Sequence, residues 1–465
     1  MKIVVIIGAG MGGLTGAIRL AQAGFNVQIL EARNQSGGLA AGAQYEGFSF
    51  DAGPYILLDR PGLEWAFERL GLDLERELHL FRIEAIYEVE GQDGSRVRFY
   101  SDRERTAAGF ERAWPGSARR YLDFVARTER IAKALRPMLL VSRPSAVGLL
   151  QTGAWMHVPF LMKSLGTVLK ASRLPQAIVE AMAIWTHIAG QTKDEAPSPL
   201  AFVPALMHSV GAFYPAGGIR RIPHSLEQAA IRAGVGIRYR TKVKQLRLAN
   251  RKVNGVETDT GEFIPADAVV SNAAALGTYL ELANLDSTTA HLLRLPLQSP
   301  GVCAYLAVRR RPEAPYLRFK LPGGNERCRL LISPAVLNEP AIDGWHAARL
   351  LAPMTYGDAK SGGAAGQGAY LDHLLDETWW RNDAGDVRIL HRRSASEWGA
   401  EYNLYADSMN PVMTARFMRA GRFAHRSPYI KGLYLAGSST HPGQWVSFCA
   451  ISGVLAADCA IKDLG

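Results

Sequence analysis

The feature that most constrains this chain is a glycine-rich turn that joins an apolar run to a helical pattern. The run Lys2–Ile7 has the composition of a buried parallel strand and leads directly into Gly8–Gly13, with the sequence G-A-G-M-G-G. A helical pattern over Leu14–Ala23 follows, and a second apolar run, Asn26–Leu30, ends next to Glu31. This order predicts the strand, turn, helix and strand of a βαβ unit.

The glycines and the acid have separate tasks in such a unit. Gly8 allows the tight turn, and Gly10 lets a pyrophosphate approach the backbone. Gly13, next to Gly12 in the same loop, lets the helix pack closely on the strand. The helix N-terminus offers free N–H groups to the phosphates. Because Glu31 stands where a carboxylate accepts hydrogen bonds from a ribose diol, the sequence predicts a dinucleotide site.

Two further glycine-containing segments indicate which dinucleotide binds. Gly37-Gly38 begins six residues after Glu31, and a D-x-G segment, Asp51–Gly53, comes later. Paired glycines let a second loop pass close to a cofactor without a Cβ clash. The whole pattern resembles the extended N-terminal signature of the amine oxidase and phytoene desaturase flavoproteins. The resemblance implies that FAD is the cofactor and that it also contacts Ala32, Arg33, Gly37, Gly38, Leu39, Gly53 and Pro54.

One position departs from this signature. The resembled flavoproteins usually have Arg or Lys where this chain has Leu39. The departure removes one positive charge from the neighbourhood of the phosphates. It predicts either weaker FAD binding or compensation by the nearby Arg33.

The resemblance continues in the middle of the chain. Phe213–Gly218 resembles the Y-P-x-G-G element of phytoene desaturases, and a helical pattern over Ile219–Ala233 follows. The next strand pattern contains Val243, which by resemblance contacts the adenine through its backbone. A hairpin is expected over residues 252–264.

The last part of the chain matches the same family. Ala268–Ala273 resembles its V-V-S-N-A element, and Gly432–Gly437 followed by Ser438–Gly443 resembles its closing flavin-binding motif. A final helix over Ser447–Lys462 would direct its N-terminus at the flavin ring, where the helix dipole favours negative charge. The resemblance implies further FAD contacts from Gly437, Ser438, Trp445 and Val446.

A chain of 465 residues is long enough for two or three domains. The resemblance implies an α/β fold, in which a Rossmann-type FAD-binding domain carries a discontinuous α+β substrate domain with a helical cap. The FAD-binding segments are expected at 1–75, 212–275 and 420–465, and the substrate domain at 76–211 and 276–419. The second substrate segment is expected to contain strands at Val302–Val308 and Arg349–Pro353, a small-residue loop at Ser361–Gly368 and a helix at Leu371–Trp380.

The formal charge of +10 raises the question of an anionic partner. Nucleic acid is not expected, because the positive residues are scattered and no binding motif accompanies them. A peripheral contact with anionic lipid headgroups remains an alternative to an arginine-rich surface without a partner. No cleavable apolar segment precedes the first strand, so a cytoplasmic location is expected, with peripheral membrane association as an addition.

The block from about Pro137 to Val210 bears on the membrane question. It contains several apolar stretches, but none reaches eighteen uninterrupted apolar residues, so a membrane span is not expected. Lys163, Lys170 and Arg173 flank amphipathic segments that contain Trp and Phe, a composition that suits an interfacial position. The alternative is that these segments pack as the cap over the active site.

The resemblance implies flavin chemistry with no metal. The leading hypothesis is a desaturase or dehydrogenase of an apolar isoprenoid or polyene substrate, which passes hydride to flavin N5 and electrons to oxygen or a quinone. An amine or amino-acid oxidase that releases peroxide is the first alternative. A carotenoid or retinoid isomerase or saturase is the second, and a non-catalytic flavoprotein that serves as a membrane partner is the third.

Three residues are candidates for direct roles near the flavin. Trp445 replaces the glycine-rich stretch that usually follows this turn in carotenoid desaturases, so it either walls the substrate site or packs beneath the flavin. His441 is either a proton carrier or part of the flavin loop. Tyr214 either faces the flavin or has a structural role.

Overall fold

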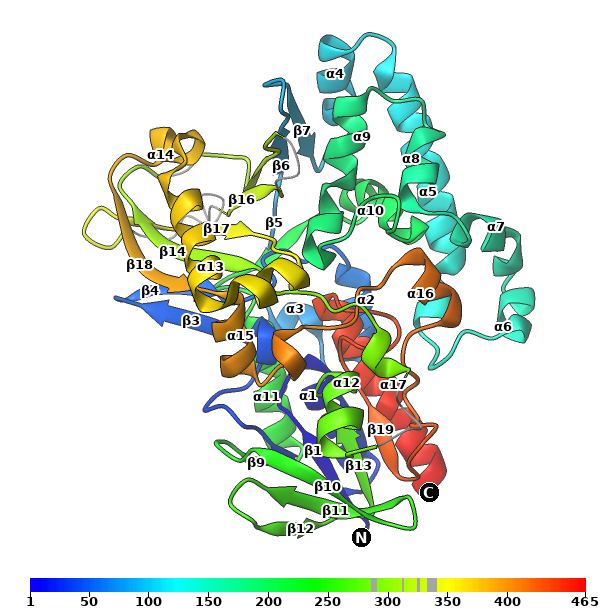
Figure 1. The fold of residues 1–465 in the computed structure, drawn as a ribbon. Coiled ribbons are helices and arrows are strands. Elements are labelled where there is room, and N and C mark those ends of the chain that lie inside the picture. Colours follow the sequence, from blue (N-terminus) through cyan, green and yellow to red (C-terminus); the bar gives the residue numbers. More distant parts are fainter. Residues whose placement is uncertain (286–290, 312, 324–326, 333–340) are drawn as a thin grey trace.

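A five-stranded parallel sheet is the centre of one half of the molecule in the computed structural model, which describes residues 1–285, 291–311, 313–323, 327–332 and 341–465 (Figure 1). All four strand pairings are parallel. The sheet is of the predicted Rossmann type. Its strands, in spatial order, are β19 (Leu433–Leu435), β13 (Ala268–Ser271), β1 (Ile3–Ile7), β2 (Asn26–Leu30) and β9 (Gly236–Arg238).

Helices α1 (Met11–Gln22), α11 (Arg221–Arg232) and α17 (Val446–Leu464) lie together beside this sheet (Figure 1). The N-terminal and C-terminal helices α1 and α17 pack against each other over much of their length. The hydroxyl of Thr15 donates to the carbonyl of Ala450 at 2.9 Å. The first and last elements of the chain therefore form one core.

A seven-stranded mixed sheet forms a second layer, as expected for an α+β substrate domain. Only the pairing of β15 with β6 is parallel. The predicted strand Val302–Val308 is confirmed, whereas the one predicted at Arg349–Pro353 begins earlier. In spatial order the strands are β18 (Val387–Arg393), β14 (Val302–Val308), β17 (His346–Ala352), β16 (Arg329–Ile332), β15 (Leu317–Lys320), β6 (Ala85–Glu90) and β7 (Arg96–Tyr100).

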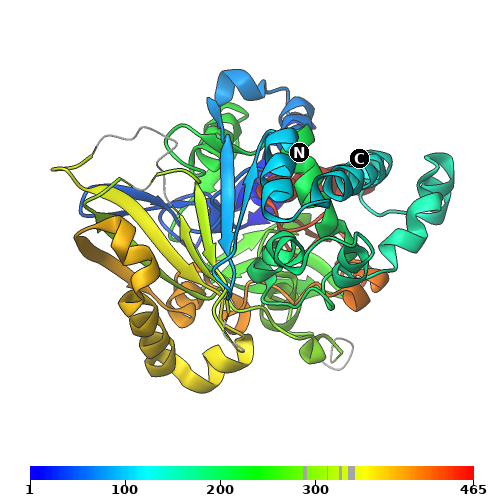
Figure 2. The ribbon, with the colours of Figure 1, turned by 90° about the horizontal axis from the view of Figure 1, so that it is seen from above.

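A helical region adjoins the seven-stranded sheet, and its outermost helices α6 and α7 project to one side (Figures 1 and 2). No helix within the described ranges is both long enough and apolar enough to cross a bilayer. The helices are α4 (Arg103–Ala113), α5 (Ser117–Leu139), α6 (Ala146–Gln151), α7 (Val158–Leu161), α8 (Leu165–Lys170), α9 (Gln176–Ala183) and α10 (Val203–Ser209).

Smaller elements complete the fold. Three strands, β10 (Val243–Ala249), β11 (Lys252–Thr258) and β12 (Phe263–Pro265), confirm the predicted hairpin. Strand β5 (Leu80–Arg82) pairs with β8 (Phe213–Pro215) across an expected domain boundary, so the positions of the boundaries stay a prediction. The other elements are β3 (Gly42–Tyr45), β4 (Phe48–Asp51), α2 (Arg60–Arg69), α3 (Leu74–Glu77), α12 (Ala275–Gly277), α13 (Tyr356–Asp376), α14 (Thr378–Ala384), α15 (Ala395–Tyr402) and α16 (Ala415–Ala420).

Two predictions in the second substrate segment were wrong. The stretch Ser361–Gly368 lies inside α13 rather than in a loop. The stretch has a kink at Gly363, where the backbone is not helical. The Gln367 amide spans the kink by donating to the Ala359 carbonyl, and it makes a tertiary contact by donating to the Ser396 hydroxyl. The helix predicted at Leu371–Trp380 is broken at Glu377, whose backbone is extended and whose carboxylate accepts from the fully buried Arg329 at 2.8 Å.

Arg349 on β17 joins the seven-stranded sheet to the D-x-G segment, which begins at the last residue of β4. Its side chain is buried, and its guanidinium donates to the carbonyls of Asp51, Ala52 and Gly53, with distances of 3.0 and 2.9 Å for the last two. A buried guanidinium that is satisfied by three carbonyls is costly to remove, because its loss leaves buried acceptors without donors. Arg349 therefore fixes the D-x-G segment to the second sheet.

We expect Arg349→Met to lower the free energy of unfolding by about 2–5 kcal/mol, since three buried carbonyls lose their donors. The matched control is Arg388→Gln, which removes an exposed ion pair with Glu46 and should cost less than about 1 kcal/mol. Urea and thermal unfolding curves measure both. Equal loss of stability in the two variants would contradict the structural role of Arg349.

Candidate functional site

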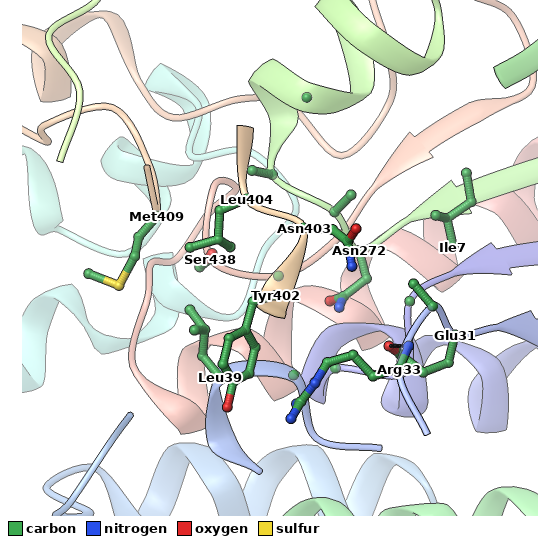
Figure 3. A pocket seen from close by; sticks show the side chains of 18 of the residues that line it. Ile7, Glu31, Arg33, Leu39, Asn272, Tyr402, Asn403, Leu404, Met409 and Ser438 are labelled. Atoms are coloured by element: carbon green, nitrogen blue, oxygen red, sulfur yellow. Dashed lines mark hydrogen bonds between the residues drawn. The ribbon is translucent and has the colours of Figure 1, made fainter. Parts of the chain in front are cut away.

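A cavity of about 520 Å³ opens at the carboxyl ends of β1, β2 and β13. Figure 3 shows that it is elongated, with Glu31, Arg33 and Ile7 toward one end and Met409 and Ser438 toward the other. Ligands of open α/β sheets bind at the carboxyl ends of the strands. Its lining comes from chain segments far apart in sequence, including α15 and the turn before α17.

The glycine-rich turn forms one wall of the cavity as bare backbone. Gly8 and Gly10 line the cavity, and Gly8 has a φ of +92°. A Cβ on Gly10 would lie 2.3 Å from the amide nitrogen of Asn272. Gly12 and Gly13 do not line it but pack directly behind it, since a Cβ on Gly13 would lie 2.0 Å from the Gly8 carbonyl.

Glu31 lies at the end of β2 with its carboxylate held by backbone amides. One oxygen accepts from the Ala9 N–H at 2.7 Å, and the other accepts from the Arg33 N–H at 2.8 Å. The side chain is buried but lines the cavity together with Ala32. Each carboxylate oxygen has further acceptor capacity, so this carboxylate suits a ribose diol.

Arg33 lines the cavity and shares one carboxylate partner with a second arginine. Its guanidinium pairs with Glu401 at 2.7 Å and lies over the ring of Tyr402, 4.1 Å from the ring centroid. Arg393 binds the other oxygen of the same carboxylate at 2.8 Å. The cluster of Arg33, Arg393 and Glu401 keeps one net positive charge, so compensation for Leu39 by Arg33 stays a prediction.

The second loop and the closing turn supply most of the remaining predicted contacts. The Gly37 N–H donates to the Ala9 carbonyl at 2.8 Å, which holds the second loop against the first. Gly53 is packed behind the wall, because its Cβ would lie 2.5 Å from the Leu39 carbonyl. The predicted residues of this group that line the cavity are Gly37, Gly38, Leu39, Pro54, Val243, Gly437, Ser438 and Val446.

Tyr214 and His441 lie outside the residues that line this cavity. The Tyr214 hydroxyl donates to Asp51 at 2.6 Å, next to the segment held by Arg349. The His441 Nε2–H donates to the Met138 carbonyl at 2.8 Å, and burial lowers the pKa of His441 to about 4. A neutral His441 ties the closing turn to α5, and direct roles for both residues stay predictions.

Trp445 is the residue immediately before α17, and it also lies outside the cavity lining. Its ring stacks on Phe448 with 5.0 Å between centroids and packs against the hydrophobic core. Gln444 and Val446, its two neighbours, do line the cavity. This placement favours the packing alternative for Trp445, and its contact with substrate stays a prediction.

Several lining residues were not assigned from sequence. Asn272 follows β13 inside the V-V-S-N-A element, so that motif carried a usable signal. Its amide lies between Gly10, Gly12 and Gly437. The others, contributed mainly by α15 and the segment after it, had no such signal: Tyr402, Asn403, Leu404, Met409, Gln444 and Cys449.

The cavity meets the requirements of FAD in three respects. A backbone-only wall at the start of α1 suits a pyrophosphate, the Glu31 carboxylate suits a ribose, and α17 begins at the opposite end with Val446 and Cys449 in the lining. The family model described as flavin containing amine oxidoreductase matches residues 11–277, more than half of the 465 residues. The chain belongs to this family. It is an FAD-dependent oxidoreductase.

Individual relatives extend along the whole flavoprotein. A zeta-carotene-forming phytoene desaturase of Myxococcus xanthus is 28% identical and covers 98% of this chain and 93% of the relative. A 4,4'-diaponeurosporene oxygenase of Staphylococcus aureus is 24% identical, covering 98% and 97%. The crystal structure of an oxidoreductase from Methanosarcina mazei shares the fold with a TM-score of 0.66 and 18% identity, covering 98% and 100%.

We expect Gly10→Val to purify largely without flavin, because its side chain would collide with Asn272 and fill the approach to the backbone. A cost of about 1–3 kcal/mol weakens FAD binding by about fivefold to about 150-fold. The control is Gly109→Val on α4, where a Cβ meets nothing within 4 Å. Flavin absorbance per protein measures both, and full flavin content in Gly10→Val would contradict the assignment of the wall.

Proposed function

We propose that this flavoenzyme is a desaturase of an apolar, polyene-type isoprenoid. The observation that carries the proposal is the composition of the cavity end that lies opposite Glu31. Leu39 and Met409 are apolar there (Figure 3). The closing turn and the start of α17 add the apolar Val446, with Ser438 and Gln444 as polar lining side chains. The two carotenoid-related relatives, each aligned over nearly the whole chain, support the same substrate class.

The lining carboxylates argue against an amine as substrate. Oxidation of an amine or amino acid usually needs a charged group that orients the ligand. Glu31 is engaged by two backbone amides, and Asp407 packs on the backbone of Gly399 in α15. Glu281 has its pKa raised by burial and lies near Lys242. None of the three is on the closing turn.

The protein's own groups orient and shield the reaction. When bound, FAD supplies hydride acceptance, and a proton leaves the neighbouring carbon as the double bond forms. The chain holds the cofactor by backbone walls, and its apolar lining keeps water from the reacting carbons. We propose oxygen or a quinone as the electron acceptor, because no second G-x-G-x-x-G motif was identified for a nicotinamide.

The flavin-loaded protein should be reduced, under anaerobic conditions, by liposomes that carry phytoene and not by a panel of amines and amino acids. Bleaching of the flavin absorbance measures reduction, and mass spectrometry measures the hydrogen lost from the polyene. The Gly10→Val protein is the control for flavin-independent change. Peroxide release with amines alone would favour the oxidase, and a polyene with altered absorption but unchanged mass would favour the isomerase.

We also propose that this enzyme reaches its substrate at a membrane surface. The apolar protrusion, residues 141–162, carries seven of the fourteen exposed large apolar side chains found in the described ranges. Trp155 is 53% exposed and Leu150 is 64% exposed. Its exposed basic neighbours include Arg143 and Lys163, which suits a contact with anionic headgroups.

The apolar protrusion is tied to the closing end of the cavity by two contacts. Arg419 on α16 donates to the Met162 carbonyl at 3.1 Å. His441 donates to the Met138 carbonyl at the end of α5, the helix that leads into the protrusion. We propose that an apolar substrate leaves the bilayer at this surface and enters the cavity at the end that includes Ser438 and Val446.

Trp155→Ser should bind anionic liposomes about tenfold more weakly, equivalent to ~1.4 kcal/mol, whereas Phe263→Ser on the distant hairpin β11–β12 should bind like the parent protein. Binding should also fall with salt, since the Debye length shortens to about 3 Å at 1 M. Co-sedimentation measures both effects. If both variants lost liposome binding equally, the protrusion would not be the surface that contacts the membrane.

A further inference from the structure

A half-buried arginine lies behind the closing turn of the cavity. Arg422 follows α16, next to Phe423, which forms a bridge with Thr440. Its Nη1 donates to the Ser438 carbonyl at 3.4 Å. A Cβ on Gly443 would lie 3.3 Å from Nη2, so the guanidinium is packed against the turn over residues 438–443.

The positive charge of Arg422 has no carboxylate partner among the described residues. Its Nε is buried without a hydrogen-bond acceptor. Burial lowers the pKa of Arg422 to about 10, which still leaves it charged at neutral pH. A buried charge is retained at a cost unless another group compensates it.

The titratable neighbours of Arg422 do not supply the compensating charge. Burial raises the pKa of the Cys449 thiol to about 12, so this thiol stays neutral. Burial lowers the pKa of His441 to about 4, so the imidazole is neutral as well. The charge of Arg422 is therefore available to whatever occupies the adjoining part of the cavity, which Ser438 and Cys449 line.

A second positive feature converges on the same place. Helix α17 begins at Val446, and no side chain caps its N-terminal amides. The N-terminus of a helix carries a partial positive charge that extends over its first turn. Val446 and Cys449 of this first turn both line the cavity. The guanidinium and the helix dipole therefore act on one end of the cavity.

We propose that Arg422 is a positioning residue that acts through its charge and makes the bound flavin easier to reduce. The inference rests on the proposed function, which places the flavin ring at this end of the cavity. The bound flavin would accept a hydride, two electrons with one hydrogen, from the substrate C–H bond, while the neighbouring carbon would release a proton as the double bond forms. The ring would gain one negative charge, which the guanidinium would balance. The oxygen or quinone acceptor would later take up the two electrons together with the hydrogen from N5 and a proton from solvent.

The test is the midpoint potential of the flavin in purified, flavin-loaded protein without substrate. Arg422→Met should lower it by at least about 30 mV, which corresponds to a tenfold change in the equilibrium of a two-electron couple. Arg422→Lys, which keeps the charge, should retain most of the parent potential. The matched control is Arg419→Met, three residues earlier on α16, which should leave the potential unchanged.

A measurement on the parent protein covers the case in which Arg422→Met does not fold. The midpoint potential of the flavin in the parent protein should fall as pH rises, at half the slope of a two-proton reduction. The slope is halved because the reduced ring keeps a negative charge and so takes up one proton instead of two. This half slope should persist below the pKa of free reduced flavin. A full slope there, or an unchanged potential in folded Arg422→Met, would overturn the proposal.

The outcomes separate this proposal from the proposed function. If Arg422→Met has an unchanged potential and the enzyme turns over phytoene, the proposed role of Arg422 is wrong and the proposed desaturase function stands. If the potential of Arg422→Met is lowered but the enzyme does not turn over phytoene, the role of Arg422 stands and the desaturase function is wrong. The two results are independent because the potential is measured without any substrate.

Discussion

The close approach of the glycine-rich turn, helix α1 and helix α17 is the constraint on which the rest of the molecule depends. A Cβ on Gly13 would lie 2.0 Å from the Gly8 carbonyl, and a Cβ on Gly453 would lie 2.1 Å from the Gly12 carbonyl. Helices α1 and α17 approach this closely only because these positions lack side chains. The same lack of side chains leaves the bare backbone wall that a pyrophosphate requires, so core packing and cofactor binding share one cause.

Several buried or half-buried arginines surround this core, and they differ in the groups that compensate their charges. Arg349 is satisfied by three carbonyls and fixes the D-x-G segment to the second sheet. Arg33 and Arg393 share the carboxylate of Glu401, so one of their two positive charges is compensated beside the cavity. Arg422 donates to the Ser438 carbonyl but has no carboxylate partner in the part of the chain that the structure describes. Its positive charge therefore remains uncompensated next to the first turn of α17.

Local pattern was a reliable guide where short-range constraints dominate. Strands β2 and β14 have the predicted ends, because a buried parallel or central strand reads as an uninterrupted apolar run. The pattern failed where a distant partner decided the outcome. The glycine-rich stretch at 361–368 forms helix on both sides of a kink at Gly363, and Gln367 within it is held by Ser396. A helix is broken at Glu377, whose carboxylate accepts from Arg329. Propensity is a weak prior that such contacts override.

The sequence by itself determined the Rossmann-type half, the FAD cofactor and the wall formed by the first glycines, since consecutive residues carry that motif and its backbone geometry. Only the tertiary structure decided what closes the cavity. Tyr402 and Met409 enter it from a segment without a motif, and Gln444 rather than Trp445 lines it because the Trp445 ring stacks on Phe448. The charge at the site was decided in the same way. Whether an arginine has an ion-pair partner, as Arg33 has in Glu401, depends on which carboxylate the fold brings within reach, and no local pattern encodes that distance.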